Sequence, residues 1–310
     1  MARKSRTLRR KPARPRRDTV ADMIRMAVRR FKAAKLAFAH GTTDPVAEAA
    51  FIVGEVMRLP IERVASSEGR IVPAAARKRI LDLIERRVGT RKPAAYLLRR
   101  MYMRGVPFYV DERVIVPRSY IGEILDSEEF AGAPFSLVPE PGKVRRILDL
   151  CTGSGCLAIL AARRFPKAQV DAVDISSDAL QVARRNVSMH RLGRRVRLFQ
   201  GDLFAPVERE RYDLIVSNPP YVDARGMACL PPECRHEPRL AFDGGPDGLD
   251  LVRRIVAEAG RHLTADGGLL CEIGRGRKSL QRAYPGLRFL WLDTEESTGE
   301  VFWLDARQLR

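Results

Sequence analysis

Apolar and polar positions divide the chain into two patterns. Before residue 100, apolar residues recur at helical spacing, as from Val20 to Phe31 and from Ile80 to Val88. From Ile147 onward, short apolar runs alternate with helical patterns. That alternation is typical of a parallel sheet covered by helices. The pattern therefore predicts a small helical unit followed by an α/β unit.

Capping residues set the expected ends of the first helices. Asp18 or Thr19 is predicted to cap the first helix, and Gly41 to end it. Asp44 stands before a proline at the first position of the second helix, and Pro73 opens another. Residues 18–100 are thus expected to form a helical domain.

The stretch between the two units is expected to connect them. Residues from Val106 to Val116 alternate around an acidic turn and predict a hairpin, followed by a helix from Tyr120 to Phe130. Residues 131–143 are rich in proline and predict a linker. We therefore expect residues 101–143 to hold the hairpin, helix and linker, and residues 144–310 to form the α/β domain.

Four consecutive predicted strands end in small or polar residues. These ends are the turn Thr152-Gly153-Ser154-Gly155, then Asp174, then Gly201-Asp202-Leu203, and last Asn218-Pro219-Pro220-Tyr221. The carboxyl ends of parallel strands form the edge where open α/β sheets bind ligands. The pattern therefore predicts one binding site built from all four ends.

The glycine turn matches neither of two common phosphate-binding motifs, GxxxxGK[ST] and GxGxxG. No lysine follows it, as the GxxxxGK[ST] loop would require, and the full GxGxxG spacing of a dinucleotide site is absent. Asp174 lies about 20 residues beyond the turn, at the end of the second strand, where an acidic side chain suits a ribose diol. The ligand expected here carries a ribose.

This constellation resembles the class I S-adenosylmethionine-dependent methyltransferases, which have a Rossmann-like, mainly parallel seven-stranded sheet. The Asn-Pro-Pro-Tyr tetrad at residues 218–221 resembles that of enzymes methylating a planar amino or amide nitrogen. The stretch FYVDERVIVPRS, residues 108–119, is similar to the hairpin of the protein glutamine methyltransferases. Its VPRS form resembles the ribosomal-protein branch more than the release-factor branch, which usually reads IPRPET. With Glu237-Pro238 and Asp247-Gly248-Leu249, the resemblance covers roughly residues 20–305.

The resemblance implies a function and a set of site residues. It implies S-adenosyl-L-methionine as the methyl donor, a glutamine of large-subunit ribosomal protein L3 (uL3) as the acceptor, and a helical domain that helps to grip this protein. The tetrad Asn218, Pro219, Pro220 and Tyr221 would bind the acceptor amide and carry catalysis. The expected cofactor-binding residues are Asp149, Thr152, Gly153, Ser154, Gly155, Cys156, Asp174, Ile175, Asp202, Leu203 and Asn218.

The chemistry of amide methylation gives the tetrad its expected roles. An amide nitrogen is a poor nucleophile because its lone pair is delocalised into the carbonyl group. The side-chain carbonyl of Asn218 and the backbone carbonyl of Pro219 would accept its two N–H groups, and would bind more strongly as the nitrogen gains positive charge. The two prolines fix φ and add no competing donor. Tyr221 would stack on the flat amide.

Charge and cysteine content add expectations about partners and location. The 310 residues carry a formal net charge of +18, which favours contact with RNA or an RNA-rich particle. Residues 2–17 hold nine Lys and Arg and no acid, so we expect a disordered arm that binds ribosomal RNA or is a dispensable tail. Five cysteines favour the reducing cytoplasm. No apolar run reaches membrane-spanning length, so no membrane partner is expected.

Several alternatives remain open at this point. The acceptor could be the GGQ loop of peptide-chain release factors or a base of nucleic acid, and a non-enzymatic assembly factor would need only a vestigial pocket. Asp149 is expected either to cap the glycine loop or to meet the ammonium group of the cofactor. Phe108 and Pro117 are expected to wall an adenine pocket or to pack within the hairpin. His190 and His262 are predicted at the surface, and no metal site is expected.

Overall fold

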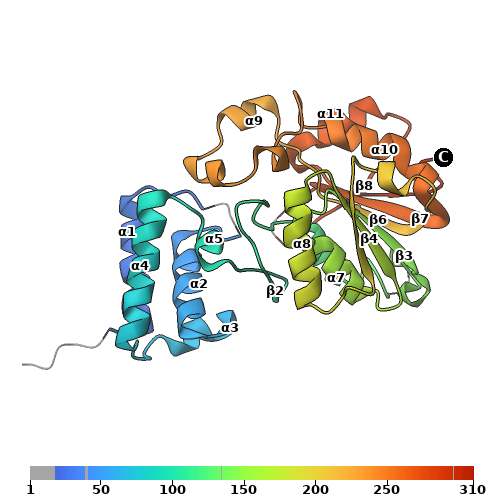
Figure 1. The fold of residues 1–310 in the computed structure, drawn as a ribbon. Helices are drawn as coiled ribbons and strands as arrows, with labels where there is room; N and C mark the ends of the chain where they lie inside the picture. Colours follow the sequence, from blue (N-terminus) through green and yellow to red (C-terminus); the bar gives the residue numbers. More distant parts are fainter. Residues whose placement is uncertain (1–17, 39–40, 134, 296) are drawn as a thin grey trace, which may run out of the picture.

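The computed structural model describes residues 18–38, 41–133, 135–295 and 297–310. The predicted basic arm, residues 1–17, lies outside the described residues. Figure 1 shows a helical unit on one side and a sheet flanked by helices on the other. In the described part of the chain, no helix is both long and apolar enough to cross a membrane.

The N-terminal helices pack around one apolar core. They are α1 (Val20–Ala33), α2 (Pro45–Met57), α3 (Ile61–Val64), α4 (Ala74–Thr90) and α5 (Ala94–Leu98). Met23, Phe31, Ile52 and Ile80 come from three of these helices and are fully buried in the shared cluster. The helical spacing in the sequence therefore gave the correct buried faces.

Two of the predicted caps are confirmed and one is wrong. The Thr19 side chain accepts from the backbone N–H of Asp22, and Asp22 accepts from Thr19 in return. The carboxylate of Asp44 accepts from two backbone N–H groups of α2. Gly41 does not end α1, because the helix stops at Ala33 and the chain takes a left-handed conformation at Lys35, with φ 49°.

A seven-stranded sheet follows, in the order β5-β4-β3-β6-β7-β9-β8. Its strands are β3 (Arg146–Leu150), β4 (Gln169–Asp174), β5 (Val196–Gln200), β6 (Tyr212–Ser217), β7 (Leu263–Glu272), β8 (Leu290–Leu292) and β9 (Val301–Asp305). The strands β5, β4, β3, β6 and β7 are parallel, and β9 is antiparallel to both of its neighbours. This is the mainly parallel sheet that the sequence predicted. The strand order changes direction at β3, which has β4 on one side and β6 on the other.

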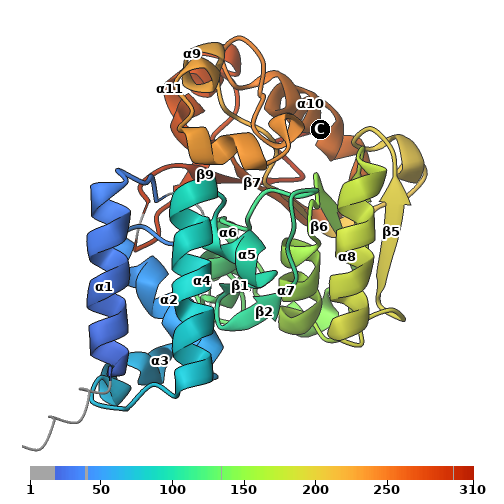
Figure 2. The ribbon, with the colours of Figure 1, turned by 60° about the vertical axis from the view of Figure 1, so that its left-hand side comes forward.

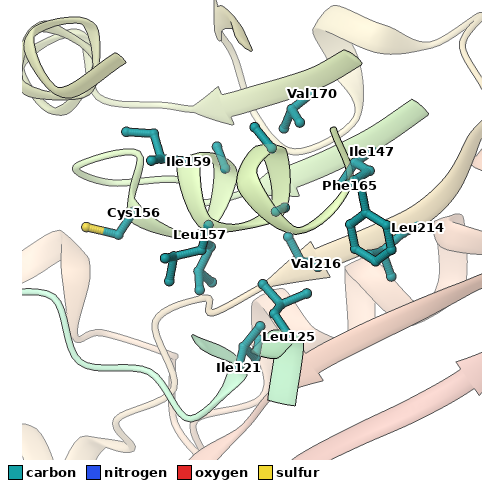
Figure 3. Close-up of a cluster of buried hydrophobic side chains, with 14 of the residues drawn as sticks. Ile121, Leu125, Ile147, Cys156, Leu157, Ile159, Phe165, Val170, Leu214 and Val216 are labelled. Atoms are coloured by element: carbon teal, nitrogen blue, oxygen red, sulfur yellow. The ribbon is translucent and has the colours of Figure 1, made fainter. Parts of the chain in front are cut away.

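Helices cover both faces of the sheet, as Figure 2 shows. They are α6 (Ile121–Asp126), α7 (Cys156–Arg164), α8 (Ser177–Met189), α10 (Asp250–His262) and α11 (Arg277–Ala283). Alternate residues of each strand face opposite sides. Leu214 and Val216 of β6 join the cluster with α6 and α7 drawn in Figure 3, while Ile215 joins the cluster with α10. The two cores hold the strand ends of the sheet in a fixed array.

The predicted hairpin is displaced along the chain. The strands are β1 (Met101–Met103) and β2 (Val106–Phe108), joined by Arg104 and Gly105, which both have positive φ. The rest of the predicted hairpin, residues 109–116, is irregular instead. Its apolar residues Val110, Val114 and Val116 are buried in a cluster with α5 and α8. Packing against two helices, rather than strand pairing, explains the apolar alternation there.

Two other expectations are corrected by packing. The helix predicted to reach Phe130 is α6, which ends at Asp126 because Ser127 is extended, with ψ 149°. His262 is buried, and its ring stacks on Phe204 with centroids 4.5 Å apart. His190 is half-buried, and its Nε2 lies 2.8 Å from the carbonyl oxygen of Pro107. Neither histidine is a surface residue.

Candidate active site

A cavity of about 230 Å³ lies at the carboxyl edge of the sheet. One side of it comes from the ends of four adjacent parallel strands, β3, β4, β5 and β6. These lining residues are Cys151, Gly153, Val173, Asp174, Ile175, Ser176, Ala179, Gly201, Asp202, Leu203, Asn218 and Pro220. The opposite side consists of Arg113, Val114, Ile115, Pro238, Leu240, Ala241, Leu251 and Arg254. The four strand ends that the sequence singled out therefore meet at one site.

The loop after β3 turns sharply at the cavity wall. Cys151 has φ 59° and Gly153 has φ 55°, and at the end of β5 Leu203 has φ 48°. Left-handed backbone at residues other than glycine is strained and clusters at functional sites. Gly155 has φ 80°, and an added Cβ would lie 3.2 Å from Ala183. A side chain there would press the loop away from α8.

Asp174 ends β4 and holds the neighbouring loop. Its Oδ2 accepts from the backbone N–H of Gly153 at 2.8 Å, and its Oδ1 accepts from Ser176 at 2.9 Å. Burial raises the pKa of Asp174, and the two backbone donors oppose that rise. The carboxylate thus lines the cavity and fixes the glycine loop beside it.

Asp149 lies beneath the loop, and the cavity-lining residues do not include it. Its Oδ2 accepts from the Thr152 hydroxyl at 2.5 Å and from the backbone N–H of Ala158 at 2.9 Å. Burial raises the pKa of Asp149 to about 7. Oδ2 therefore caps the loop and α7, whereas Oδ1 is buried and has no hydrogen-bond partner among the described residues.

Asp202 lies at the exposed rim of the cavity. Its Oδ2 accepts from a guanidinium N–H of Arg254 on α10 at 2.8 Å, and both side chains are about half exposed. Arg254 also lines the cavity. The rim at β5 is thus an ion pair rather than a lone carboxylate.

Asn218 follows β6, and its side-chain amide has a defined orientation. Its Nδ2 donates to the backbone carbonyl of Arg118 at 3.2 Å. The guanidinium of Arg118 donates to both carboxylate oxygens of Glu237, at 3.1 and 3.2 Å. Glu237 also accepts from the backbone N–H of Val116 at 2.8 Å. Because Nδ2 of Asn218 donates to the Arg118 carbonyl, Oδ1 is the side-chain atom that can accept a further hydrogen bond.

A second buried carboxylate joins the tetrad to the VPRS segment. Glu272, at the end of β7, accepts from the Tyr221 hydroxyl at 2.9 Å. It also accepts from the Ser119 hydroxyl at 2.7 Å and from the backbone N–H of Tyr120 at 3.0 Å. Burial raises the pKa of Glu272 to about 7. The phenol end of Tyr221 is therefore fixed, and its ring lies against Gly274, where a Cβ would be 2.7 Å away.

The sequence named some residues that do not line the cavity and missed others that do. The cavity wall excludes Asp149, Thr152, Ser154, Gly155, Cys156, Pro219 and Tyr221, which lie behind it or beside it. Phe108 is also outside, because its ring packs 5.4 Å from that of His190. The lining residues missing from the expected set are Arg113, Val114, Ile115, Cys151, Val173, Ser176, Ala179, Leu240, Ala241, Leu251 and Arg254. Among the wall residues outside the strand ends, Arg113, Val114 and Ile115 lie in the stretch FYVDERVIVPRS and Pro238 lies in the Glu237-Pro238 pair, so these four had a signal in the sequence.

Three kinds of comparison with known proteins each find methyltransferases. Residues 135–229 match the family model of the methyltransferase small domain. A protein of Bradyrhizobium diazoefficiens named ribosomal protein uL3 glutamine methyltransferase is 64% identical over 94% of this chain and 92% of its own length. A protein of Bordetella pertussis with the same name is 50% identical over 94% of this chain and 96% of its own length. A methyltransferase structure from Pyrococcus furiosus aligns with a TM-score of 0.46 at 18% identity, covering 66% of this chain and 89% of that one.

Proposed function

Because the chain belongs to the ribosomal protein uL3 glutamine methyltransferases, we infer how its carboxyl-edge site performs that reaction. The activity is transfer of a methyl group from S-adenosylmethionine to the side-chain amide nitrogen of a glutamine in ribosomal protein uL3. The observation that carries the inference is that Asn218, Asp174 and Asp202 line one cavity. The fold is that of the class I methyltransferases.

The cavity residues fit an adenosine-containing sulfonium donor. Asp174 would take the ribose hydroxyls, since a carboxylate accepts from both members of a diol. Asp202 would take the adenine amino group, with Ile175 and Leu203 supplying apolar contact. The unpaired Oδ1 of Asp149 would attract the ammonium group at the other end of the molecule. When bound, the donor supplies an electrophilic methyl group on a cationic sulfur.

The loop residues between these carboxylates would support the same molecule. Thr152, Gly153, Ser154 and Gly155 would approach its methionine portion, where only small residues permit close contact. Cys156 would lie beneath them as the first residue of α7. These residues would act mainly by shaping the loop, because only Gly153 of this group reaches the cavity wall.

Asn218 would be the main catalytic residue. Its Oδ1 would accept one N–H of the acceptor amide, and the Pro219 carbonyl would accept the other. The hydrogen bond from Nδ2 to the Arg118 carbonyl supports this role, because it turns the oxygen end toward the acceptor. Both acceptors bind more strongly as the nitrogen gains charge, so they stabilise the transition state more than the ground state.

Pro220 and Tyr221 would complete the acceptor pocket. Pro220 lines the cavity and holds the backbone at fixed φ. Tyr221 would present its ring to the flat amide, and the anchoring of its hydroxyl on Glu272 supports a fixed ring position. The pocket is therefore built from short, rigid groups, which suits alignment of a weak nucleophile.

Two further features belong to the same proposal. Residues 1–17 would act as a basic arm that contacts ribosomal RNA, since this stretch contains nine Lys and Arg and no Asp or Glu. We also propose a cytoplasmic location, which a ribosomal protein as substrate supports and where all five cysteines would stay reduced. They are free in the structure.

One labelling experiment tests the activity and its alternatives. The full chain is incubated with S-adenosylmethionine labelled in its methyl group and, separately, with uL3, peptide-chain release factors and RNA. We expect label in uL3, on the amide nitrogen of a glutamine. Preferential labelling of release factors or of RNA would instead assign the same site to another acceptor.

A further inference from the structure

A second cavity, of about 370 Å³, lies next to the first. It is formed by the segment that follows the tetrad, through Met227, Leu230, Cys234, Arg235, Arg239 and Phe242 among others. This segment includes α9 (Ala224–Ala228) and two short 3-10 turns. None of the residues proposed to bind the methyl donor or the acceptor amide lines this cavity.

A single stretch of chain, residues 237–242, separates the two cavities. Pro238, Leu240 and Ala241 line the cavity at the strand ends, whereas Glu237, Arg239 and Phe242 line the second one. Adjacent residues of this stretch thus face different cavities. A molecule that enters both must cross this wall.

The wall is joined directly to the tetrad. Phe242 accepts through its carbonyl oxygen from the backbone N–H of Val222 at 2.8 Å, just after Tyr221. Arg118, whose carbonyl orients Asn218, lies with its guanidinium 5.6 Å from the centre of the Phe242 ring. The second cavity is therefore next to the groups that hold the acceptor amide.

The segment that forms the second cavity is held from two sides. Glu237 accepts from Arg118 and Val116, as described above. On the other side, Glu233 is fully buried, accepts from the backbone N–H of Ala37 at 3.0 Å and pairs with Arg91 at 2.6 Å. The cavity is thus fixed to the helical domain before any substrate arrives, which lowers the ordering cost of binding.

We propose that this second cavity binds the stretch of polypeptide next to the acceptor glutamine, an inference that rests on the proposed function. Met227, Leu230 and Phe242 offer apolar contact for one side chain of that stretch. Arg235 and Arg239 are exposed and offer guanidinium donors for its carbonyl or carboxylate oxygens. The glutamine side chain then enters the first cavity while its neighbours cross the wall at residues 237–242.

Two substitutions test the site with different effects on its shape. Arg239→Ala removes a donor whose side chain is 79% exposed and whose ion pair with Asp243 spans 3.7 Å, so the fold loses little. Ala228→Trp fills the cavity from an exposed position on α9. Arg163→Ala is a matched control, because Arg163 is exposed near the C-terminal end of α7, away from the carboxyl edge of the sheet.

The measurement is steady-state methylation of full-length uL3, with calorimetric titration of S-adenosylmethionine on each variant. We expect the KM for uL3 to rise about tenfold for each cavity variant, with little change in kcat or in cofactor affinity. An unchanged KM in both variants overturns the inference while leaving the activity intact. A rise seen only with uL3 bound to RNA also overturns it, because the cavity would then recognise RNA. Failure of the wild-type chain to methylate uL3 would instead refute the proposed function.

Discussion

Asn218 lines the cavity, and the nitrogen end of its amide donates to the backbone carbonyl of Arg118, which leaves the amide oxygen as an acceptor. Asn218→Ala removes an acceptor that strengthens as the transition state forms, so we expect turnover to fall roughly a hundredfold to a thousandfold. Asn218→Asp keeps an acceptor but adds a charge that stabilises the sulfonium ground state, and it should also lower turnover. Cofactor affinity should change much less in both. Single-turnover methylation of uL3 decides the matter, and a wild-type rate in Asn218→Ala would remove this residue from catalysis.

Asp174 combines two tasks, since it lines the cavity and accepts from the Gly153 and Ser176 N–H groups. Asp174→Ala should weaken S-adenosylmethionine binding about tenfold to a hundredfold, the equivalent of roughly 1.5–3 kcal/mol for a charged hydrogen bond. Asp174→Asn keeps one acceptor oxygen and should therefore lose less affinity for S-adenosylmethionine than Asp174→Ala. Calorimetry compares the three proteins, and equal affinity in all of them would place Asp174 outside the site.

Glu272 is a buried acid that favours its neutral form in the folded protein. Its pKa is raised from 4.5 to about 7 by burial, so between these values the folded state holds a proton that the unfolded state has released. The contribution of Glu272 to stability is therefore fully present below about pH 4.5 and is lost as the pH rises through 7. Glu272→Gln should make the free energy of unfolding less steep between pH 5 and 8. Urea titrations across this range test it, and an identical slope in both proteins would show that Glu272 ionises normally.

At the scale of elements, the segment from residue 222 to 242 depends on the helical domain for its position. Glu233 is a buried contact, and in Glu233→Ala the fully buried Arg87 and the partly exposed Arg91 both lose this partner. Removing one partner of a buried ion pair is strongly destabilising, so we expect a loss of about 3 kcal/mol in the free energy of unfolding. Glu62→Ala, at an exposed position on α3, is the control and should cost less than about 0.5 kcal/mol. If Glu233→Ala lowers the free energy of unfolding no more than this control does, other contacts hold the segment in place.

The elements also show where local sequence is informative. The strand ends at Asp174, Asp202 and Asn218 were predictable because each follows an apolar run and a parallel sheet brings such ends to one edge. The hairpin was misplaced because residues 109–116 alternate to pack on α5 and α8, which only the folded chain reveals. The opposite wall of the cavity was missed for the same reason. Glu237 meets Val116 and Arg118 across about 120 residues of chain, and no local pattern records such a contact.

At the scale of the whole molecule, positive charge is concentrated at one end of the chain. Residues 1–100 contain 26 Lys and Arg against nine Asp and Glu, whereas residues 101–310 contain 30 against 29. Residues 101–310, which include every residue lining the cavity at the strand ends, are thus almost neutral. Long-range attraction to a polyanion would therefore act on the arm and the helical domain and leave the carboxyl edge of the sheet free for its protein substrate.

Nine of these charges lie in residues 2–17, and none of the residues proposed to bind the substrates lies there. The contribution of the arm to RNA binding can therefore be tested separately from catalysis. A variant with all nine Lys and Arg of the arm changed to Gln keeps the length and removes the charge. Each phosphate contact contributes a slope of about 0.7–0.9 in the logarithm of affinity against the logarithm of salt concentration. We expect the variant to bind ribosomal RNA with a slope shallower by several units, while methylating free uL3 at the wild-type rate, because none of the residues proposed to bind the cofactor or the acceptor amide lies in the arm. Filter binding at a series of salt concentrations measures the slope. If the slope is unchanged, the arm makes no phosphate contacts, and the attraction must come from the cationic side chains of α1 and α4.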